Sequence, residues 1–206
     1  MGASPLILRG ASIWQGWLDR DAQSMMLQDI RDVVRKAPLL RPITPRGQAM
    51  SVRMSAAGRF GWVSDSAGYR YSEQHPQTGT PWPEIPHSVM AVWTALSGYH
   101  RPPECCLVNF YDSQARMGMH QDRDEQDFDA PVVSISLGEK GLFRIGNHTR
   151  GGKTDSLWLS SGDVVVMGGD ARLRYHGIDR IQPGSSTLMP NGGRVNLTLR
   201  VVTPPA

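Results

Sequence analysis

The second half of the chain is a series of short strand-like segments, and this pattern limits the possible folds more than any other feature. Each segment is rich in β-branched or other apolar residues and is bounded by Gly, Asp or Pro. The segments are Cys106–Tyr111, Val132–Leu137, Gly141–Ile145, Ser156–Leu159, Asp163–Met167 and Arg194–Arg200. Many short strands with no helices between them favour an antiparallel sandwich or jelly roll over a βαβ array. We therefore predict a mainly β fold.

Two helices are predicted ahead of these strands. The first covers residues 21–37, where apolar residues recur at helical spacing, Asp21 can cap the start and Pro38 stops the helix. The second contains Val89–Leu96 and ends at Gly98. Before them, Leu6–Leu8 has the pattern of an edge strand. The helices should therefore flank the β core from its N-terminal side.

Residues 41–85 have an irregular pattern rich in Gly, Pro and aromatic residues. Met50–Met54 alternates as a strand would, and Gly61–Trp62 followed by Gly68–Tyr71 is typical of a second strand pair or an irregular hairpin. Exposed aromatic and arginine side chains on such loops could stack on nucleic-acid bases. They could equally form a lid over the core, and this stretch alone leaves both interpretations open.

His120-Gln121-Asp122, together with the distant His176, is the candidate for chemistry. In an extended strand, side chains two residues apart point to the same side, so His120 and Asp122 can reach one ion. A second histidine from another strand would complete two imidazoles and one carboxylate on one face of a metal, an arrangement that suits non-haem Fe(II) and oxygen chemistry. A His-x-Asp triplet also arises by chance, so whether this one is a metal site depends on features elsewhere in the chain.

The last predicted strand, residues 194–200, is informative because its two faces differ. Arg194, Asn196 and Arg200 share one face, and the opposite face is apolar. If the arginine face points inward it needs an anionic partner, such as a small dicarboxylate. If it points outward, it is a solvated stripe. Asn109 and Tyr111 likewise place polar groups on one face of an otherwise apolar strand.

Composition adds few limits. The chain of 206 residues is long enough for one well-buried domain, and its formal net charge is only +3. Its cations are nearly all arginine, which is compatible with a nucleic-acid partner or with codon bias in a GC-rich genome. Cys105 and Cys106 are adjacent and are expected to be small buried hydrophobes. The sequence contains neither a bilayer-length apolar run nor a secretory signal pattern, so we expect a cytoplasmic protein with no membrane association.

A series of segments in register resembles the AlkB family of Fe(II)/2-oxoglutarate-dependent dioxygenases over most of the chain. The matching segments include Thr44-Pro45, Met50-Ser51-Val52, Gly61-Trp62, Gly68 to Ser72, Pro76-Gln77-Thr78, Pro81-Trp82-Pro83, Asn109-x-Tyr111, His120 to Glu125, Ala130 to Gly138, Gly162 to Val166, Tyr175 to Ile178, and Arg194-x-Asn196-Leu197-Thr198-x-Arg200. The resemblance implies a double-stranded β-helix (jelly roll) core flanked by the two N-terminal helices. It implies a single domain over residues 1–206, with an N-terminal extension and nucleotide-recognition lid at about 1–85 and the catalytic jelly roll at about 105–202.

The resemblance also implies a set of ligands and roles. Iron would be held by His120, Asp122 and His176, and the co-substrate 2-oxoglutarate by Asn109, Tyr111, Arg194, Asn196 and Arg200. Within that set Arg194 would take the distal carboxylate, and Arg200 would lie near the chelating end. The substrate would be contacted by Trp62, Tyr69, Arg70, Tyr71, Asp124 and Arg150.

The reaction implied is repair of DNA by oxidative demethylation of 1-methyladenine and 3-methylcytosine, preferably in single strands, using O2 and releasing formaldehyde and succinate. Trp62 would sandwich the base against His120, Tyr69 and Tyr71 would contact phosphates, and Asp124 would read the exocyclic amine. Arg123 stands where the bacterial member of the family has a lysine, and the loop from Glu139 to Ser156 differs most, which puts Arg150 in doubt. A monomer is expected. The alternatives are the same chemistry on RNA or protein, or a barrel that binds metal without catalysis.

Overall fold

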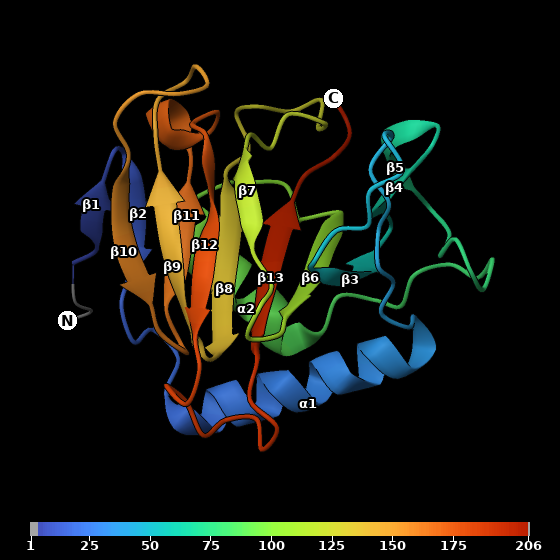
Figure 1. Cartoon of the computed structure of the whole chain (residues 1–206), viewed down its shortest axis with the longest axis horizontal. Helices are drawn as coiled ribbons and strands as arrows, with labels where there is room; N and C mark the ends of the chain where they lie inside the picture. The colour runs from blue at the N-terminus through green and yellow to red at the C-terminus, as the bar shows by residue number, and fades with distance from the viewer. Residues whose placement is uncertain (1–3, 206) are drawn as a thin grey trace.

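Two antiparallel β-sheets lie face to face, and two helices cover the outer side of the larger sheet (Figure 1). The structure is a computed structural model that describes residues 4–205. The larger sheet has the strand order β1 (Leu6–Leu8), β2 (Ala11–Trp14), β11 (Val164–Met167), β8 (Val132–Gly138), β13 (Arg194–Arg200), β6 (Cys105–Tyr111) and β3 (Arg53–Gly58). The smaller sheet has the order β10 (Asp155–Leu159), β9 (Lys140–Ile145), β12 (His176–Gln182) and β7 (Met117–His120). The predicted mainly β jelly roll is confirmed.

The remaining elements lie around this sandwich. Helices α1 (Arg20–Lys36) and α2 (His87–Leu96) pack on the larger sheet, and a short 3-10 helix, η1 (Gly169–Ala171), precedes β12. A separate hairpin of β4 (Gly61–Asp65) and β5 (Gly68–Ser72) lies on the side of the molecule away from β1 and β10 (Figure 1). Within residues 4–205 no helix has the length and apolar character needed to span a bilayer.

The central strands of the larger sheet are buried on both faces, which decides where their polar side chains lie. In β13, Val195, Leu197 and Leu199 pack in one core with Ile30 of α1 and Val92 of α2. Because side chains alternate along a strand, the arginine-bearing face of β13 points the other way, toward the smaller sheet. The outward, solvated alternative for this face is therefore wrong.

The space between the two sheets holds a second core. Leu107 of β6, Phe143 and Ile145 of β9, Val165 of β11 and Ile178 of β12 belong to it. These apolar side chains fill one part of the inter-sheet space and leave the polar side chains of β6 and β13 to line the other part. The fold thereby creates a partly polar chamber inside a β sandwich.

Several local predictions need correction. The N-cap of α1 is Asp19, whose side chain accepts the Ala22 N–H, and Asp21 lies inside the first turn. The strand predicted at Met50–Met54 instead starts at Arg53, and its residue Met54 forms an isolated bridge to Leu40. Strands β2, β7 and β12 were missed, because β2 and β7 are only four residues long and β12 mixes Gly and charged residues with its apolar ones. The hairpin, the edge strand β1 and the last strand lie where the sequence predicts them.

Candidate metal centre and active site

His120, Asp122 and His176 meet at one point, although they come from different parts of the chain. His120 is the last residue of β7 and His176 the first of β12, and the two are direct partners across this antiparallel pair. Asp122 lies in the loop after β7, so the expected strand geometry holds only as far as His120. The Nε2 atoms of His120 and His176 lie 3.6 and 3.7 Å from the Asp122 carboxylate oxygens. One ligand atom from each residue falls within 4.8 Å of the others, as a shared metal requires.

Both imidazoles are oriented by backbone carbonyls. Nδ1 of His120 lies 2.9 Å from the Gly118 carbonyl oxygen, and Nδ1 of His176 lies 3.0 Å from that of Arg174. A carbonyl only accepts, so Nδ1 carries the proton in each ring and the lone pair stays on Nε2. Such a carbonyl partner is the usual support of a metal-binding histidine. Both Nε2 atoms therefore face the common point ready to bind a cation.

The charges around Asp122 keep it ionised. Burial by itself raises its pKa, but the positive charge of Arg200, with contributions from His176 and His120, holds the pKa well below the usual value. Arg200 donates a 2.8 Å hydrogen bond to Oδ1, while Oδ2 is buried and accepts no hydrogen bond among the described residues. Burial lowers the pKa of His176 to about 4, so its ring is neutral at neutral pH. One free carboxylate oxygen and two free imidazole lone pairs fit a divalent metal.

The inner face of β13 supplies two buried guanidinium groups. Arg194 is fully buried, donates to the Ser136 hydroxyl at 2.8 Å and forms no ion pair with a carboxylate of residues 4–205, and burial lowers its pKa to about 10. Glycine at position 141 is required because a Cβ there would lie 2.9 Å from Nε of Arg194. A buried cation that remains charged without a counter-ion is costly. The site is therefore suited to an anion.

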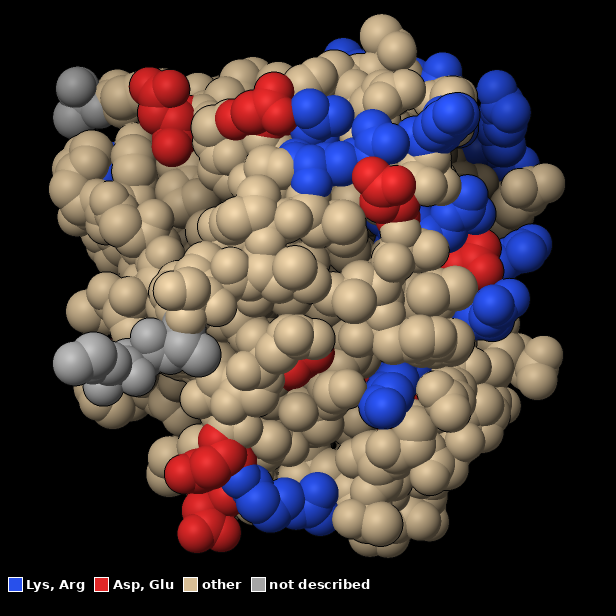
Figure 2. Space-filling model, turned by 90° about the vertical axis from the view of Figure 1, so that its left-hand side faces the viewer, with Lys and Arg blue, Asp and Glu red and all other residues tan. Residues whose placement is uncertain are grey.

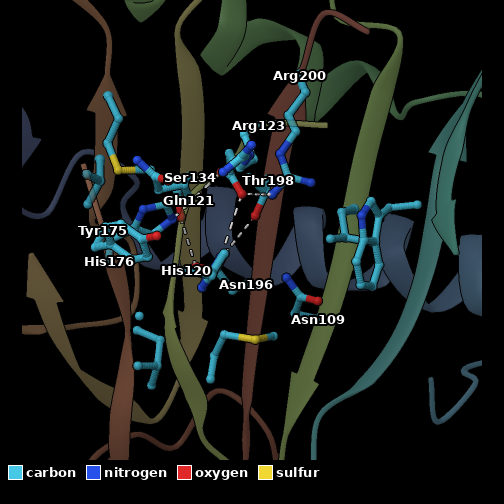
Figure 3. A pocket seen from close by; sticks show the side chains of 18 of the residues that line it. Asn109, His120, Gln121, Arg123, Ser134, Tyr175, His176, Asn196, Thr198 and Arg200 are labelled. Atoms are coloured by element: carbon cyan, nitrogen blue, oxygen red, sulfur yellow. Dashed lines mark hydrogen bonds and ion pairs between the residues drawn. The ribbon is translucent and has the colours of Figure 1, made fainter. Parts of the chain in front are cut away.

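A cavity of about 450 Å³ opens beside the three candidate metal ligands. Figure 3 shows His120 and His176 on one side of it, with Asn109, Asn196 and Arg200 on strands facing them. The buried Oδ1 of Asn109 accepts no hydrogen bond among the described residues. Arg194 does not line this cavity itself, but it contacts Asn196, which does. The chamber can hold a small polar acid next to a metal.

The mouth of the same cavity is aromatic and charged. Trp62 of β4 and Tyr69 of β5 are stacked, with ring centroids 5.4 Å apart and planes 16° apart. Asp124 and Arg150 line the cavity with them. Arg150 lies over the Tyr175 ring, with its guanidinium carbon 5.3 Å from the ring centroid. A flat ligand entering here would meet the aromatic stack before it reached His120.

Comparison with known proteins agrees with this geometry. A family described as the 2OG-Fe(II) oxygenase superfamily matches residues 10–200. An "Alpha-ketoglutarate-dependent dioxygenase AlkB homolog" of Caulobacter vibrioides is 50% identical over 201 residues, covering 97% of this chain and 91% of that protein. The chain belongs to the AlkB family of 2-oxoglutarate- and Fe(II)-dependent oxygenases. The "Alpha-ketoglutarate-dependent dioxygenase AlkB" of Escherichia coli is 40% identical over 184 residues, covering 87% of this chain and 85% of that protein.

A solved structure supports the AlkB-family fold. The structure titled "The structure of OsALKBH1" superposes with a TM-score of 0.82 at 28% identity, covering 97% of this chain and all of that one. As an AlkB-family oxygenase, the protein uses Fe(II), 2-oxoglutarate and O2. The fit of its own residues to these groups rests on the free ligand atoms of the triad and on the buried, unneutralised Arg194.

Not every residue expected at the substrate reaches the cavity. Arg70 makes a two-pronged ion pair with Asp65 across the turn of its own hairpin, at 2.9 and 2.7 Å. The Tyr71 hydroxyl points inward and donates to Glu125, and this tyrosine does not line the cavity. In this structure, therefore, Tyr71 directs its hydroxyl to a buried carboxylate instead of the surface position that a phosphate contact needs. Trp62 stacks on Tyr69, so the expected sandwich with His120 would have to form when a base enters.

Three residues around the triad were not identified from the sequence. Gln121 donates to the Leu173 and His148 carbonyls at 2.6 and 3.1 Å, which ties the loop after β9 to the triad. Glu125 and Arg172 are buried beside Asp122 and form an ion pair at 3.1 Å. Glu125 ends the acidic run after His120, so its position close to the ligands was a usable signal. Arg172 lies in an irregular segment whose sequence has no such pattern.

Some of the basic side chains at the surface form ion pairs with acidic ones. Figure 2, which views the molecule from the β1 and β10 side, shows Lys and Arg gathered toward the upper right with Asp and Glu among them. Arg9 pairs with Asp155 at 2.6 Å, and Arg144 of β9 pairs with Asp179 at 3.3 Å. These two arginines are neutralised within the protein, whereas basic side chains predominate at the upper right of this view.

Proposed function

We propose that this oxygenase demethylates nucleic acid, and specifically that it removes methyl groups from 1-methyladenine and 3-methylcytosine in DNA, with a preference for single strands. The observation that carries the proposal is the position of Trp62, Tyr69 and Asp124 at the mouth of the cavity that contains His120 and His176. Stacking rings next to a carboxylate suit a flat, cationic, amine-bearing ring, and both methylated bases have that character.

The geometry around the cavity supports the residue roles that the family resemblance implies. We assign iron to His120, Asp122 and His176, and 2-oxoglutarate to Asn109, Tyr111, Arg194, Asn196 and Arg200. Burial raises the pKa of Tyr111 to about 12, so its hydroxyl stays protonated and can donate to a carboxylate. Arg194 offers positive charge to the distal carboxylate, provided that the co-substrate reaches past Asn196. Arg200 offers a donor near the chelating end.

The substrate roles divide between the hairpin and the triad loop. Trp62 and Tyr69 receive the base on their ring faces, and Asp124 accepts from its exocyclic amine. Arg150 borders the same cavity and offers positive charge to the phosphate backbone. Arg70 and Tyr71 would take part only if the hairpin moved, because their polar ends are occupied by Asp65 and Glu125. A base has to leave its stack to enter, which explains the proposed preference for single strands.

His120, Asp122 and His176 would hold the iron, which together with 2-oxoglutarate and O2 would supply the oxidising power for hydroxylation of a methyl carbon. The hydroxylated N-methyl group would then break down to formaldehyde and the unmodified base, while 2-oxoglutarate would lose carbon dioxide and leave as succinate. The protein's own part is to orient the base: Trp62 fixes the plane of the ring, and Asp124 fixes its rotation in that plane. The apolar side chains between the sheets keep bulk water away from the reacting carbon.

Two relatives that match less than half of this chain support nucleic acid as the substrate, but they differ in whether it is DNA or RNA. The "DNA N(6)-methyladenine demethylase ALKBH1D" of Arabidopsis thaliana is 37% identical over 108 residues, covering 48% of this chain and 24% of that protein. The "tRNA demethylase abh1" of Schizosaccharomyces pombe is 37% identical over 87 residues, covering 42% of this chain and 29% of that protein. RNA is therefore the second candidate. Protein as a substrate has no specific observation in its favour, and membership of an oxygenase family argues against a barrel without catalysis.

Succinate and formaldehyde release test the proposal directly. The iron-loaded protein would be given matched oligonucleotides containing 1-methyladenine or 3-methylcytosine, as single-stranded DNA, duplex DNA and RNA, with unmethylated oligonucleotides as controls. We expect methyl-dependent release of both products, fastest on single-stranded DNA. Faster release on RNA would assign RNA as the substrate. Release on no oligonucleotide, with iron bound, would overturn the proposal.

A further inference from the structure

Behind Asp122 lies a buried charged cluster, and two of its members, Glu125 and Arg172, have no assigned role toward the metal or the co-substrate. It consists of Glu125 and Arg172, each no more than 4% exposed, together with Arg200 of β13. Two guanidinium groups and two carboxylates, those of Asp122 and Glu125, balance in charge. Placing four charged groups in a protein interior is costly unless each has close partners. A function is therefore to be sought in what the cluster holds in place.

Arg172 holds the main chain of Asp122. Its Nη1 donates to the Asp122 carbonyl oxygen at 2.6 Å, and its Nε donates to the Ala130 carbonyl at 2.9 Å. Its Nη2 donates to Oε2 of Glu125 at 3.1 Å. The planar guanidinium thus spans both ends of the loop that carries Asp122. No strand pairing fixes Asp122, because β7 ends at His120.

Glu125 joins the two arginines. Its Oε2 accepts the hydrogen bond from Nη2 of Arg172, and its Oε1 lies 3.2 Å from Nε of Arg200. Arg200 in turn donates to Oδ1 of Asp122 at 2.8 Å. Oε1 also accepts the hydroxyl of Tyr71, so strand β5 is attached to the same carboxylate. Asp122 is consequently held at its backbone by one arginine and at its side chain by the other, with Glu125 as their common partner.

We propose that Arg172 and Glu125 are positioning residues that set the geometry of the metal ligand Asp122. Arg172 fixes the backbone from which the Asp122 side chain projects. Glu125 fixes Arg172 and also fixes Arg200, which occupies Oδ1 and leaves Oδ2 free for the cation. The proposal rests on the iron and 2-oxoglutarate chemistry of the family and is independent of which nucleic acid is the substrate.

The different contacts of the two residues predict different defects. Arg172 touches Asp122 but none of the residues assigned to 2-oxoglutarate, so Arg172→Lys should weaken metal binding and leave the 2-oxoglutarate requirement unchanged. Glu125 touches Arg200 as well, so Glu125→Gln should weaken metal binding and also raise the KM for 2-oxoglutarate. Loss of a group that orients a metal ligand commonly reduces metal affinity about 10- to 100-fold, so we expect changes of about tenfold or more.

The primary measurement is the Kd for Co(II), with no nucleic acid present, followed by the visible absorption of bound Co(II), which reports the coordination geometry. The KM and kcat for 2-oxoglutarate are measured separately by succinate formation. The controls are Arg144→Lys and Asp179→Asn. These residues form another arginine–carboxylate ion pair, between β9 and β12, whose side chains are about 40% exposed. Both control variants should retain the parent Kd and absorption.

The result that overturns the proposal is a folded Arg172→Lys variant whose Co(II) Kd and absorption equal those of the parent, even if its thermal stability is lower. Should Arg172→Lys not fold, Glu125→Gln decides alone, because glutamine has the same shape and can still accept one of the hydrogen bonds. Parent-like metal binding in Glu125→Gln would then reject the positioning role. Because these readouts need no oligonucleotide, they stand apart from any failure of the nucleic-acid assignment.

Discussion

The indole Nε1 of Trp62 donates a hydrogen bond of 2.8 Å to Oδ2 of Asp124. The same indole is stacked on Tyr69. The ring proposed to hold the base and the carboxylate proposed to read it are therefore hydrogen-bonded to each other when no base is bound. A base that enters has to replace both contacts, which gives an advantage to ligands that offer a ring face and an amine together. This exchange is a physical basis for selection at the mouth of the cavity.

Asp124→Asn should reduce turnover of cationic bases selectively. The variant keeps the shape of the side chain but loses the negative charge, and a hydrogen bond to a charged group contributes about 1.5–3 kcal/mol. We expect kcat/KM for 1-methyladenine oligonucleotides to fall roughly 10- to 100-fold at that magnitude, with the Co(II) Kd unchanged. Asp129→Asn, an exposed carboxylate in the same loop, is the matched control. If metal binding fell and base selectivity did not, Asp124 would be a structural residue.

Trp62→Phe and Trp62→Ala should separate stacking from hydrogen bonding. Phenylalanine retains a smaller ring face and loses the N–H that donates to Asp124, whereas alanine removes the stack. Aromatic stacking on a base contributes about 1–3 kcal/mol, so alanine should raise the KM for the oligonucleotide by about tenfold or more. The phenylalanine variant should stay within a few-fold of the parent. Equal losses in both variants, measured by steady-state kinetics, would mean that the hydrogen bond matters more than the stack.

Asp122→Ala should abolish turnover by loss of the metal. The variant removes the only carboxylate among the three candidate ligands and leaves Arg200 with Glu125 as its remaining acidic partner. We expect the circular dichroism spectrum to be retained and bound iron, measured after gel filtration, to fall to background. Asp112→Ala in an exposed loop should keep both metal and activity. Normal turnover in Asp122→Ala would remove this residue from the site.

The parts of the fold that the sequence could predict are those with strong periodic patterns. The strand at 194–200 alternates without interruption between apolar and polar residues, and its observed bounds match the predicted ones. This alternation reflects the packing of its apolar face on the helices. Strand β7 could not be predicted, since four residues containing Gly118 have no usable alternation. Its position depends on pairing with β12. Residue pattern alone also left the direction of Arg194 open, because burial of both sheet faces is a property of the assembled fold.

The candidate site could be predicted for the residues that carry motif chemistry. His120, Asp122 and His176 meet as predicted, although Asp122 is held by Arg172 and Arg200 and not by a strand. The parts of the site that the sequence did not predict depend on contacts between segments that are far apart in the chain. The inward turn of the Tyr71 hydroxyl depends on Glu125, 54 positions away, and no spacing rule reports such a pair.

Arg194→Lys should raise the requirement for 2-oxoglutarate. Lysine keeps the charge but lacks the planar fork that pairs with a carboxylate and also donates to Ser136. We expect the KM for 2-oxoglutarate to rise about tenfold or more, as for loss of one charged hydrogen bond, with a smaller change in kcat. Arg116→Lys, an exposed arginine outside the cavity lining, serves as the control. An unaltered KM in Arg194→Lys would mean that the buried guanidinium is neutralised in some other way.

Alkaline pH should destabilise the protein through Cys105 and Cys106. Burial raises the pKa of Cys105 to about 12 and that of Cys106 well above its usual value, while both thiols ionise near their ordinary value of about 8.5 once unfolded. Above that value the unfolded state binds fewer protons than the folded state, so the free energy of unfolding falls as pH rises, by about 1.4 kcal/mol per unit for each thiol. Urea unfolding at pH 8 and pH 10 should show this loss, and the double variant Cys105→Ala/Cys106→Ala should show a shallower dependence. Because tyrosines ionise later in this range, equal slopes in the two proteins would exclude the thiols as the cause.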